Sequence, residues 1–484
     1  IACIAGGVTL IIAKPMFFTL ALGIGLASLG VMIIIFLFKF LFKRNKTDLS
    51  NFTEVKRSEE PKLFAFIDEI VAETKTNFPK KVFLSSEVNA SVFYDSSFWS
   101  MILPIKKNLH IGLGLVNSVT VSELKGILAH EFGHFSQKSM KVGSYVYNVN
   151  KVIHNMLFEN ESYENAISKT ANKSGYFALL LYISVGFNQM AKYILQAMYK
   201  IVNINYMGLS REMEFHADEV AAHVTGYQPL KTSLLRMDLA SKSLNSVLAL
   251  YQSKSDAGII SENIFSEQSF VMHFLAEKEA IPIENGLPNV PQKELSTFQQ
   301  SKLEITNQWA SHPELEERIV ALEKTGIEKA TINYEGAMHL FQNKEDLEKA
   351  LTAKLFALAA EGKQQQQQLM DYNTFEVEFK KKYAQETFHP VFKGYYDYHS
   401  PVQFKTDEVQ YINTTFEALY VEYYVNMAQE LGTLRSDLAI LEAIENKQTN
   451  IQSFDYEGKK YKAKEASRVA DTFKKLIEEK EAAL

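Results

Sequence analysis

Two apolar runs open the chain, and their lengths predict how it meets a membrane. Residues 1–13 are apolar but too short to cross a bilayer alone, and Lys14–Pro15 ends the run. Residues 16–38 form a second apolar run of 23 residues, which is long enough to cross. We therefore expect residues 1–46 to form a transmembrane helix hairpin whose first span lacks its beginning, because the chain opens on isoleucine.

A basic cluster after the second run predicts its orientation. These residues are Lys39, Lys43, Arg44 and Lys46. Basic residues favour the cytoplasmic side of a membrane, so everything that follows is expected to be cytoplasmic. Two other interpretations fit less well. A buried core helix would show a polar face before Lys39, and a signal peptide would be shorter and end at small residues.

The next segment predicts a linker, a helix and a small sheet. Residues 47–60 are polar and charged, as in a linker, and residues 63–74 have apolar positions at helical spacing. Three stretches rich in β-branched and aromatic residues then predict short strands, at 79–84, 88–94 and 109–115. Residues 89–91 are a candidate edge strand that an extended peptide can join, although an ordinary core strand fits the pattern equally well.

A helix carrying His130 and His134 holds the candidate chemistry. At 3.6 residues per turn this spacing places both imidazoles on one face, where they can bind one zinc ion, and Glu131 stands beside them as a candidate general base. Thr120 and Glu123 form a capping box that predicts where the helix begins. A surface helix with two solvated histidines is the alternative, but the flanking positions are apolar: Leu124, Ile127, Leu128 and Phe132.

The third ligand is expected from a second helix that begins near residue 210. Glu214 and Asp218 are four residues apart and share a face, so one can bind the metal while the other supports a ligand histidine. His216 points to another side of the helix and is expected to be a hydrogen-bonded or solvent-exposed histidine. The residues alone leave an ordinary charged helix open as the explanation of this segment.

The apolar stretch at 175–207 lies between the two ligand helices, so it determines how many times the chain crosses the membrane between them. An even number of membrane crossings must separate the two ligand helices, because their side chains have to meet on one side. Polar residues interrupt the later part of this stretch, which leaves too little continuous apolar sequence for two spans. We expect one long helix with no crossing, either buried or lying on the membrane surface.

The last third of the chain predicts helices and one hairpin. Residues 344–360 form a charged amphipathic helix, and the leucines between 427 and 441 have coiled-coil spacing that suits a helix hairpin. Residues 454–461 predict a β-hairpin with its turn at 457–458, and a charged helix runs on to 484. We expect a helical accessory domain that gates a cleft or binds a protein partner.

Composition narrows the possible partners and cofactors. The net charge of -6 gives no reason to expect nucleic acid as a partner. The single cysteine, Cys3, excludes a disulfide framework and a thiolate metal site, so histidine and carboxylate must hold any zinc. We expect a mainly α protein of the α+β class, with a membrane hairpin (1–46), a zincin-type domain with a small β-sheet (47–325) and the accessory domain (326–484).

Several motifs in order resemble one family. The sequence His-Glu-Phe-Gly-His at 130–134, Ser-Arg-x-x-Glu-Phe-x-Ala-Asp at 210–218, the segment 311–319 and the strand at Asn89–Ala90 are similar to those of the HtpX-like and type-1 CAAX prenyl protease family of membrane zinc peptidases, which are gluzincins. The resemblance covers roughly residues 60 to 325 and implies an integral membrane protein of the bacterial inner-membrane type. The absence of a full membrane barrel argues against a prenylated substrate.

This resemblance implies roles for particular residues. Glu214 is implied as the third zinc ligand and Asp218 as the support of a ligand histidine. His312 is implied to contact substrate or the developing oxyanion, although a helix-start residue before Pro313 is the alternative. Arg318 is implied to hold its own element in place. The residues implied to contact substrate are Asn89, Ala90 and Arg318.

The sequence therefore predicts a membrane-bound zinc metalloendopeptidase with one zinc ion per chain and Glu131 as general base. The resemblance implies membrane-associated or misfolded polypeptides as substrates, as in protein quality control. The alternative is an inactive membrane scaffold with a structural zinc site and partner-binding C-terminal helices, but such a site has no use for a general base.

Overall fold

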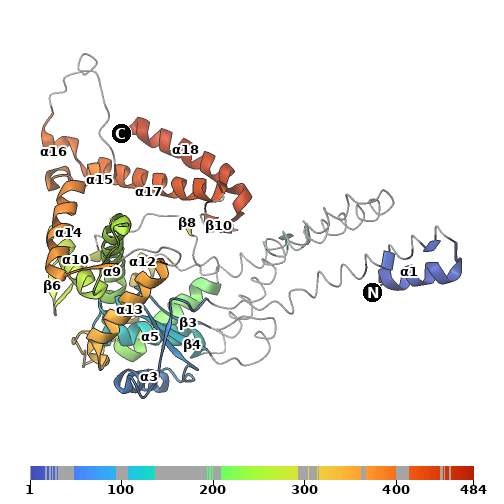
Figure 1. Cartoon of the computed structure of the whole chain (residues 1–484), viewed down its shortest axis with the longest axis horizontal. Helices are drawn as coiled ribbons and strands as arrows, with labels where there is room; N and C mark the ends of the chain where they lie inside the picture. The colour runs from blue at the N-terminus through green and yellow to red at the C-terminus, as the bar shows by residue number, and fades with distance from the viewer. Residues whose placement is uncertain are drawn as a thin grey trace, which may run out of the picture.

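The computed structural model describes residues 2–16, 48–93, 107–136, 209–292, 315–360, 367–398, 414–446 and 459–484, with single residues and short pieces between them. The protein is mainly helical with a small sheet, as expected (Figure 1). The labelled α-helices are α1 (Ala2–Ala13), α3 (Pro61–Glu73), α4 (Leu113–Val116), α5 (Val121–Ser136), α9 (Tyr227–Ser253), α10 (Ile264–Lys278), α12 (Leu315–Thr325), α13 (Lys344–Ala359), α14 (Tyr372–Glu386), α15 (Tyr395–Tyr398), α16 (Phe416–Leu419), α17 (Glu422–Glu445) and α18 (Ala466–Ala483). Residues 209–225 form a further helix.

A sheet of four strands precedes the metal-motif helix α5. Its strands are β1 (Thr53–Val55), β2 (Val82–Ser85), β3 (Ala90–Phe93) and β4 (Asn108–Gly112), in the order β1-β2-β4-β3. β2 and β4 are parallel, and the other pairs are antiparallel. Strands form in all three predicted stretches, but the third ends at Gly112, and residues 113–115 belong to helix α4. Strand β3 lies at an edge of the sheet.

Strand β1 corrects one prediction, because it lies inside the segment interpreted as a linker. Thr53–Val55 pairs antiparallel with β2, and Val55 is buried in the core. On the opposite face Glu54 pairs with Lys81. With a single buried apolar residue, three residues are too few for an alternating pattern to show in the sequence.

One hydrophobic core joins most of the described elements. It runs from Val55 in β1 through the inward face of the sheet, α3, α5, α9 and α10 to Phe379 in α14. The core therefore continues past residue 325, where the sequence suggests a domain boundary. That boundary and the division into three domains stay predictions.

The remaining strands form small sheets. These are β5 (Ile259–Ser261) with β9 (Gln368–Met370), β6 (Ile283–Glu284) with β7 (Leu287–Pro288), and β8 (Leu303–Glu304) with β10 (Ser453–Tyr456) and β11 (Lys459–Lys462).

The end of the chain has a core of its own. Helices α17 and α18 pack against each other (Figure 1), and seven buried residues between Leu441 and Phe473 form a separate cluster. The hairpin β10–β11 adds Phe454 to this cluster and extends by β10 onto β8. The predicted helix hairpin, β-hairpin and terminal helix are all confirmed.

At the N-terminus, α1 ends at Ala13, directly before the predicted break at Lys14–Pro15. Within the described residues, α1 and the other helices are too short or too polar to cross a bilayer. Most of residues 17–47, including most of the predicted second span, lie outside the described residues, as does most of the predicted helix at 175–207. The membrane hairpin therefore stays a prediction.

Candidate metal centre

The start of α5 is fixed by hydrogen bonds that the sequence in part predicts. The Thr120 backbone N–H donates to Glu123 Oε2 (2.8 Å), and the Glu123 backbone N–H donates to Thr120 Oγ1 (3.3 Å), which confirms the capping box. The buried Arg236 of α9 donates to both carboxylate oxygens of Glu123, at 2.8 and 3.1 Å. The N-terminal end of the metal-motif helix is thus tied to α9.

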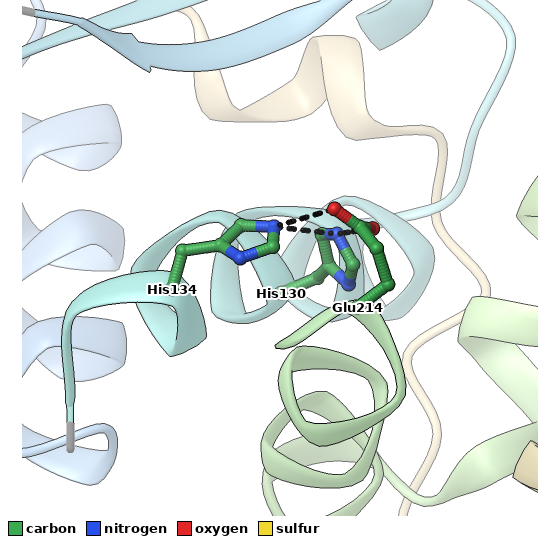
Figure 2. A group of neighbouring side chains, drawn as sticks. All are labelled: His130, His134 and Glu214. Atoms are coloured by element: carbon green, nitrogen blue, oxygen red, sulfur yellow. Dashed lines mark hydrogen bonds and ion pairs between the residues drawn. The ribbon is translucent and has the colours of Figure 1, made fainter. Parts of the chain in front are cut away.

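Three side chains from two helices meet at the other end of α5. His130 and His134 project from α5, and Glu214 projects from the helix at 209–225 (Figure 2). The two Nε2 atoms are 3.2 Å apart. His130 Nε2 lies 3.5 Å from Glu214 Oε2, and His134 Nε2 lies 3.5 Å from Glu214 Oε1. The three side chains are mostly buried, with exposed fractions of 8%, 17% and 7%.

These distances fit a zinc ion. A tetrahedral zinc with nitrogen and oxygen ligands at about 2.1 Å places neighbouring ligand atoms about 3.4 Å apart. The observed separations of 3.2 and 3.5 Å agree with that spacing. Two imidazoles and one carboxylate are also the donor set of catalytic zinc sites that keep a fourth position open. The cluster is therefore compatible with zinc.

Asp218 and Arg318 hold His130 in place on the side of its ring that faces away from the cluster. Asp218 Oδ1 lies 2.8 Å from His130 Nδ1, the ring nitrogen that faces away from the cluster. Arg318 of α12 donates from Nη2 to Asp218 Oδ1 (2.7 Å) and from Nε to Asp218 Oδ2 (2.9 Å). This bidentate pair fixes the carboxylate, and the carboxylate fixes the orientation of the imidazole.

Burial and neighbouring charges shift the pKa values of His130 and Asp218 in opposite directions. Burial disfavours the charged imidazolium, but the hydrogen bond and charge of Asp218, followed by Glu214, outweigh burial and raise the pKa of His130 to about 9. Burial also disfavours the Asp218 carboxylate, yet Arg318 and His130 hold its pKa below the usual range. The metal-free site therefore favours a proton on His130, which a metal ion must displace.

The other predicted site residues lie as follows. Glu131 is half-buried on α5, next to His130. Ala90 is buried at the start of β3, and the backbone carbonyl of Asn89 accepts a hydrogen bond from Gly112 N–H at 2.7 Å. Arg318 lies against Asp218, and its contact with substrate stays a prediction. His312 lies outside the described residues.

Sequence patterns did not reveal two ion pairs that hold the helices of the site. One is the buried Arg236–Glu123 pair, whose partners are 113 residues apart. The other joins Arg211, in the helix at 209–225, to Glu317 of α12. Neither pair has a local spacing signal, because each forms only when distant helices pack together.

These elements and donors define the class of protein: a mainly helical domain whose histidine–histidine–glutamate centre is compatible with zinc. The chain belongs to peptidase family M48, whose sequence model matches residues 58–326. The resemblance noted in the sequence is confirmed at this level, and the matched range agrees with the extent of roughly 60 to 325 expected from the motifs.

Individual relatives share part of this range. The chain is 28% identical over 141 residues to Protease HtpX of Vibrio vulnificus, covering 28% of this chain and 44% of that protein. It is 27% identical over 138 residues to Protease HtpX of Vibrio atlanticus, covering 27% and 43%. With Protease HtpX of Acinetobacter baylyi it shares 26% identity over 140 residues, covering 27% and 42%. The chain thus spans less than half the length of these relatives.

Proposed function

We propose that the protein is a zinc metalloendopeptidase. The observation that carries the proposal is the convergence of His130, His134 and Glu214 at separations that suit one tetrahedral zinc, with Glu131 on the same helix. When bound, zinc would supply Lewis acidity that polarises the scissile carbonyl and acidifies a water molecule.

The residues of the chain then have distinct tasks. His130 and His134 present Nε2 to the metal, and Glu214 presents its carboxylate. Asp218 keeps the proton of His130 on Nδ1, which leaves the Nε2 lone pair available for a ligand bond. The Glu131 carboxylate takes a proton from the attacking water and delivers it to the leaving amine nitrogen.

The edge strand β3 is the proposed docking site for substrate. In the sheet order β1-β2-β4-β3, one side of β3 pairs with β4 and its other side has no partner strand within the described sheet. A peptide can add there by main-chain hydrogen bonds next to Asn89 and Ala90. His312 would contact this peptide or the developing oxyanion, and Arg318 would contact the peptide. Family likeness favours membrane-associated or misfolded polypeptides as substrates.

We also propose that residues 1–46 anchor the chain in a membrane, with the peptidase domain (47–325) and the accessory domain (326–484) on the cytoplasmic side. The apolar run at 16–38 and the basic residues after it support this placement. The full chain should stay with the membrane pellet after alkaline carbonate extraction. Release into the supernatant would contradict the anchor.

The peptidase proposal is tested by Glu131→Gln in the full chain. This substitution keeps the shape of the side chain but removes its ability to take a proton. We expect zinc content equal to wild type and cleavage of an unfolded protein reduced by a factor of about 10²–10⁴.

Two outcomes would contradict the proposal. If the wild type binds zinc but neither protein cleaves any polypeptide, the inactive scaffold is the better description. If the wild type binds no zinc, the proposal of a zinc site at His130, His134 and Glu214 is wrong. Zinc content by metal analysis and cleavage by gel assay distinguish these results.

A further inference from the structure

Gly133 lies inside the metal motif, where α5 packs closely on the helix at 209–225. A Cβ atom at this position would lie 3.1 Å from Ala217 Cα, 3.2 Å from the Ala217 carbonyl oxygen and 3.2 Å from Val220 Cβ. Ordinary contacts of a Cβ atom start at 3.4 Å. All three neighbouring atoms belong to the backbone or are attached to it, so a side-chain rotation cannot relieve the contact. One helix would have to move away from the other.

A second glycine shows how the contact runs along α5. Gly126 precedes Gly133 by seven residues, two helical turns, and therefore shares its face. A Cβ atom at Gly126 would lie 3.1 Å from Thr225 Oγ1 and 3.6 Å from Leu230 Cβ. As α5 runs from 126 to 133, its partners run from 225 back to 217, so the two helices are antiparallel. Gly133 is the glycine at the metal end.

The ligand Glu214 and the supporting Asp218 lie on either side of this contact. Glu214 precedes Ala217 by three residues, and Asp218 follows it by one. From this position one helix reaches both nitrogens of a single ring: Glu214 Oε2 lies 3.5 Å from His130 Nε2, and Asp218 Oδ1 lies 2.8 Å from His130 Nδ1. His130 and His134 both belong to α5, so their separation does not depend on the second helix. The distance from Glu214 to both histidines does depend on it.

We propose that Gly133 is a positioning residue that sets the spacing of these two helices, and thereby brings Glu214 and Asp218 to the histidines. The proposal rests on the proposed zinc site. The proposal explains why the fourth position of the His-Glu-Phe-Gly-His motif carries no side chain. The close packing at this position brings the third ligand, Glu214, to the histidines. A methyl group there pushes the helix at 209–225 outward, which lengthens both distances from Glu214 to the histidines while the pair of histidines stays intact.

The test compares Gly133→Ala with Gly126→Ala in the full chain. Both variants add the same methyl group to the same face of α5, and both raise helix propensity equally. The methyl at Gly126 meets the Thr225 hydroxyl oxygen at 3.1 Å, two turns from the metal, so this variant tests equally close packing away from the ligands. Zinc affinity is measured by competition with a chromophoric chelator, and Co²⁺ replaces zinc for a visible absorption spectrum that reports the number and arrangement of ligands.

We expect Gly133→Ala to weaken zinc binding by about 10- to 100-fold, the range typical for lost support around a metal site, and to alter the Co²⁺ spectrum. Gly126→Ala should bind both metals as the wild type does. The inference is overturned if Gly133→Ala keeps wild-type affinity, if both variants lose affinity equally, or if metal-free Gly133→Ala fails to fold by circular dichroism. That last result would show a contact needed for the whole fold. A wild type that binds no zinc would instead reject the proposed function together with this inference.

Discussion

Glu267 is a buried carboxylate far from the metal motif in sequence, and its environment makes folding sensitive to pH. Tyr251 donates its hydroxyl to Glu267 Oε1 (2.6 Å), and Ser261 donates to Oε2 (2.8 Å). Burial raises the pKa of Glu267 to about 7, although both hydrogen bonds act to lower it. In the unfolded chain the ordinary carboxyl value of 4.5 applies.

The sign of the effect follows from proton binding. Between about pH 4.5 and pH 7 the folded protein holds a proton on Glu267 that the unfolded chain releases, so the free energy of unfolding falls as pH rises. Above about pH 7 this contribution is constant.

Glu267→Gln removes this titration, because an amide carries no charge at any pH. We expect the variant to match the wild type near pH 4.5 and to exceed its free energy of unfolding by up to about 3 kcal/mol near pH 8. Urea unfolding at a series of pH values checks the difference. A constant difference across the series would show that Glu267 does not titrate in this window.

At the scale of single residues, helical spacing predicted which side chains share a face: His130 with His134, and Glu214 with Asp218. The choice of Glu214 as the third ligand came from the family resemblance, and the structure brings its carboxylate next to both histidines. The contact of Arg318 with Asp218 could not be predicted in the same way, since it joins residues 100 positions apart. Spacing carries information within a helix, and such contacts depend on how helices pack.

At the scale of elements, α5 depends on a buried ion pair near its start. Glu123 and Arg236 have side-chain exposures of only 6% and 4%. Arg236 also donates to the backbone carbonyl oxygens of Ser118 and Pro288. One guanidinium therefore connects α5, α9, the turn before α5 and strand β7.

Glu123→Gln should lower the free energy of unfolding by about 3–5 kcal/mol, because it leaves the Arg236 charge buried without its counterion. Glutamine still fits the capping box, so the substitution changes the charge and leaves the helix start formed. Lys81→Ala is the control. Its ion pair with Glu54 is exposed, with side-chain exposures of 44% and 37%, and its loss should cost less than about 1 kcal/mol.

Urea denaturation of both variants measures these two changes in the free energy of unfolding. Equal, small changes would mean that water or a rearranged side chain compensates Arg236. A large change for Glu123→Gln alone would assign the stability of the α5 start to this pair.

The elements themselves were largely predictable. α3 begins at Pro61 and ends at Glu73, against a predicted helix at 63–74, and α13 spans Lys344–Ala359, against 344–360. Strand β1 was missed because its three residues are too few to show an alternating pattern. Its pairing with β2 defines it as a strand. Long periodic segments carry their own signal, whereas a short edge strand is defined by its neighbour.

At the scale of the whole molecule, the described residues form two hydrophobic clusters. The larger contains Phe265 of α10 and the residues around the metal motif, and the smaller contains Phe473 of α18. Both phenylalanines are fully buried. Sequence patterns predicted the C-terminal helices, but could not show that the larger core extends to Phe379, because residues far apart in the chain build it.

Phe473→Ala should destabilise the C-terminal cluster by about 3–5 kcal/mol, the usual cost of removing a buried aromatic ring. Because the clusters are separate, zinc affinity should stay at the wild-type value. Hydrogen exchange followed by mass spectrometry should rise in α17 and α18 and remain unchanged in α5 and α9.

Phe265→Ala is the matched substitution in the larger cluster. It should increase exchange in α9 and α10 and spare α18. If either variant increases exchange equally throughout the molecule, the two clusters unfold as one cooperative unit.

The pairing of β8 with β10 has a consequence for synthesis of the chain on the ribosome. Glu304 pairs with Asp455, 151 residues later. At about 5–20 residues per second, roughly 8 to 30 seconds pass between the emergence of the two strands. During that interval β8 lacks the β10 partner that it has in the finished protein, and the segment 311–319 emerges directly behind it. This part of the nascent chain thus reaches its final pairing only after residue 455 has left the ribosome.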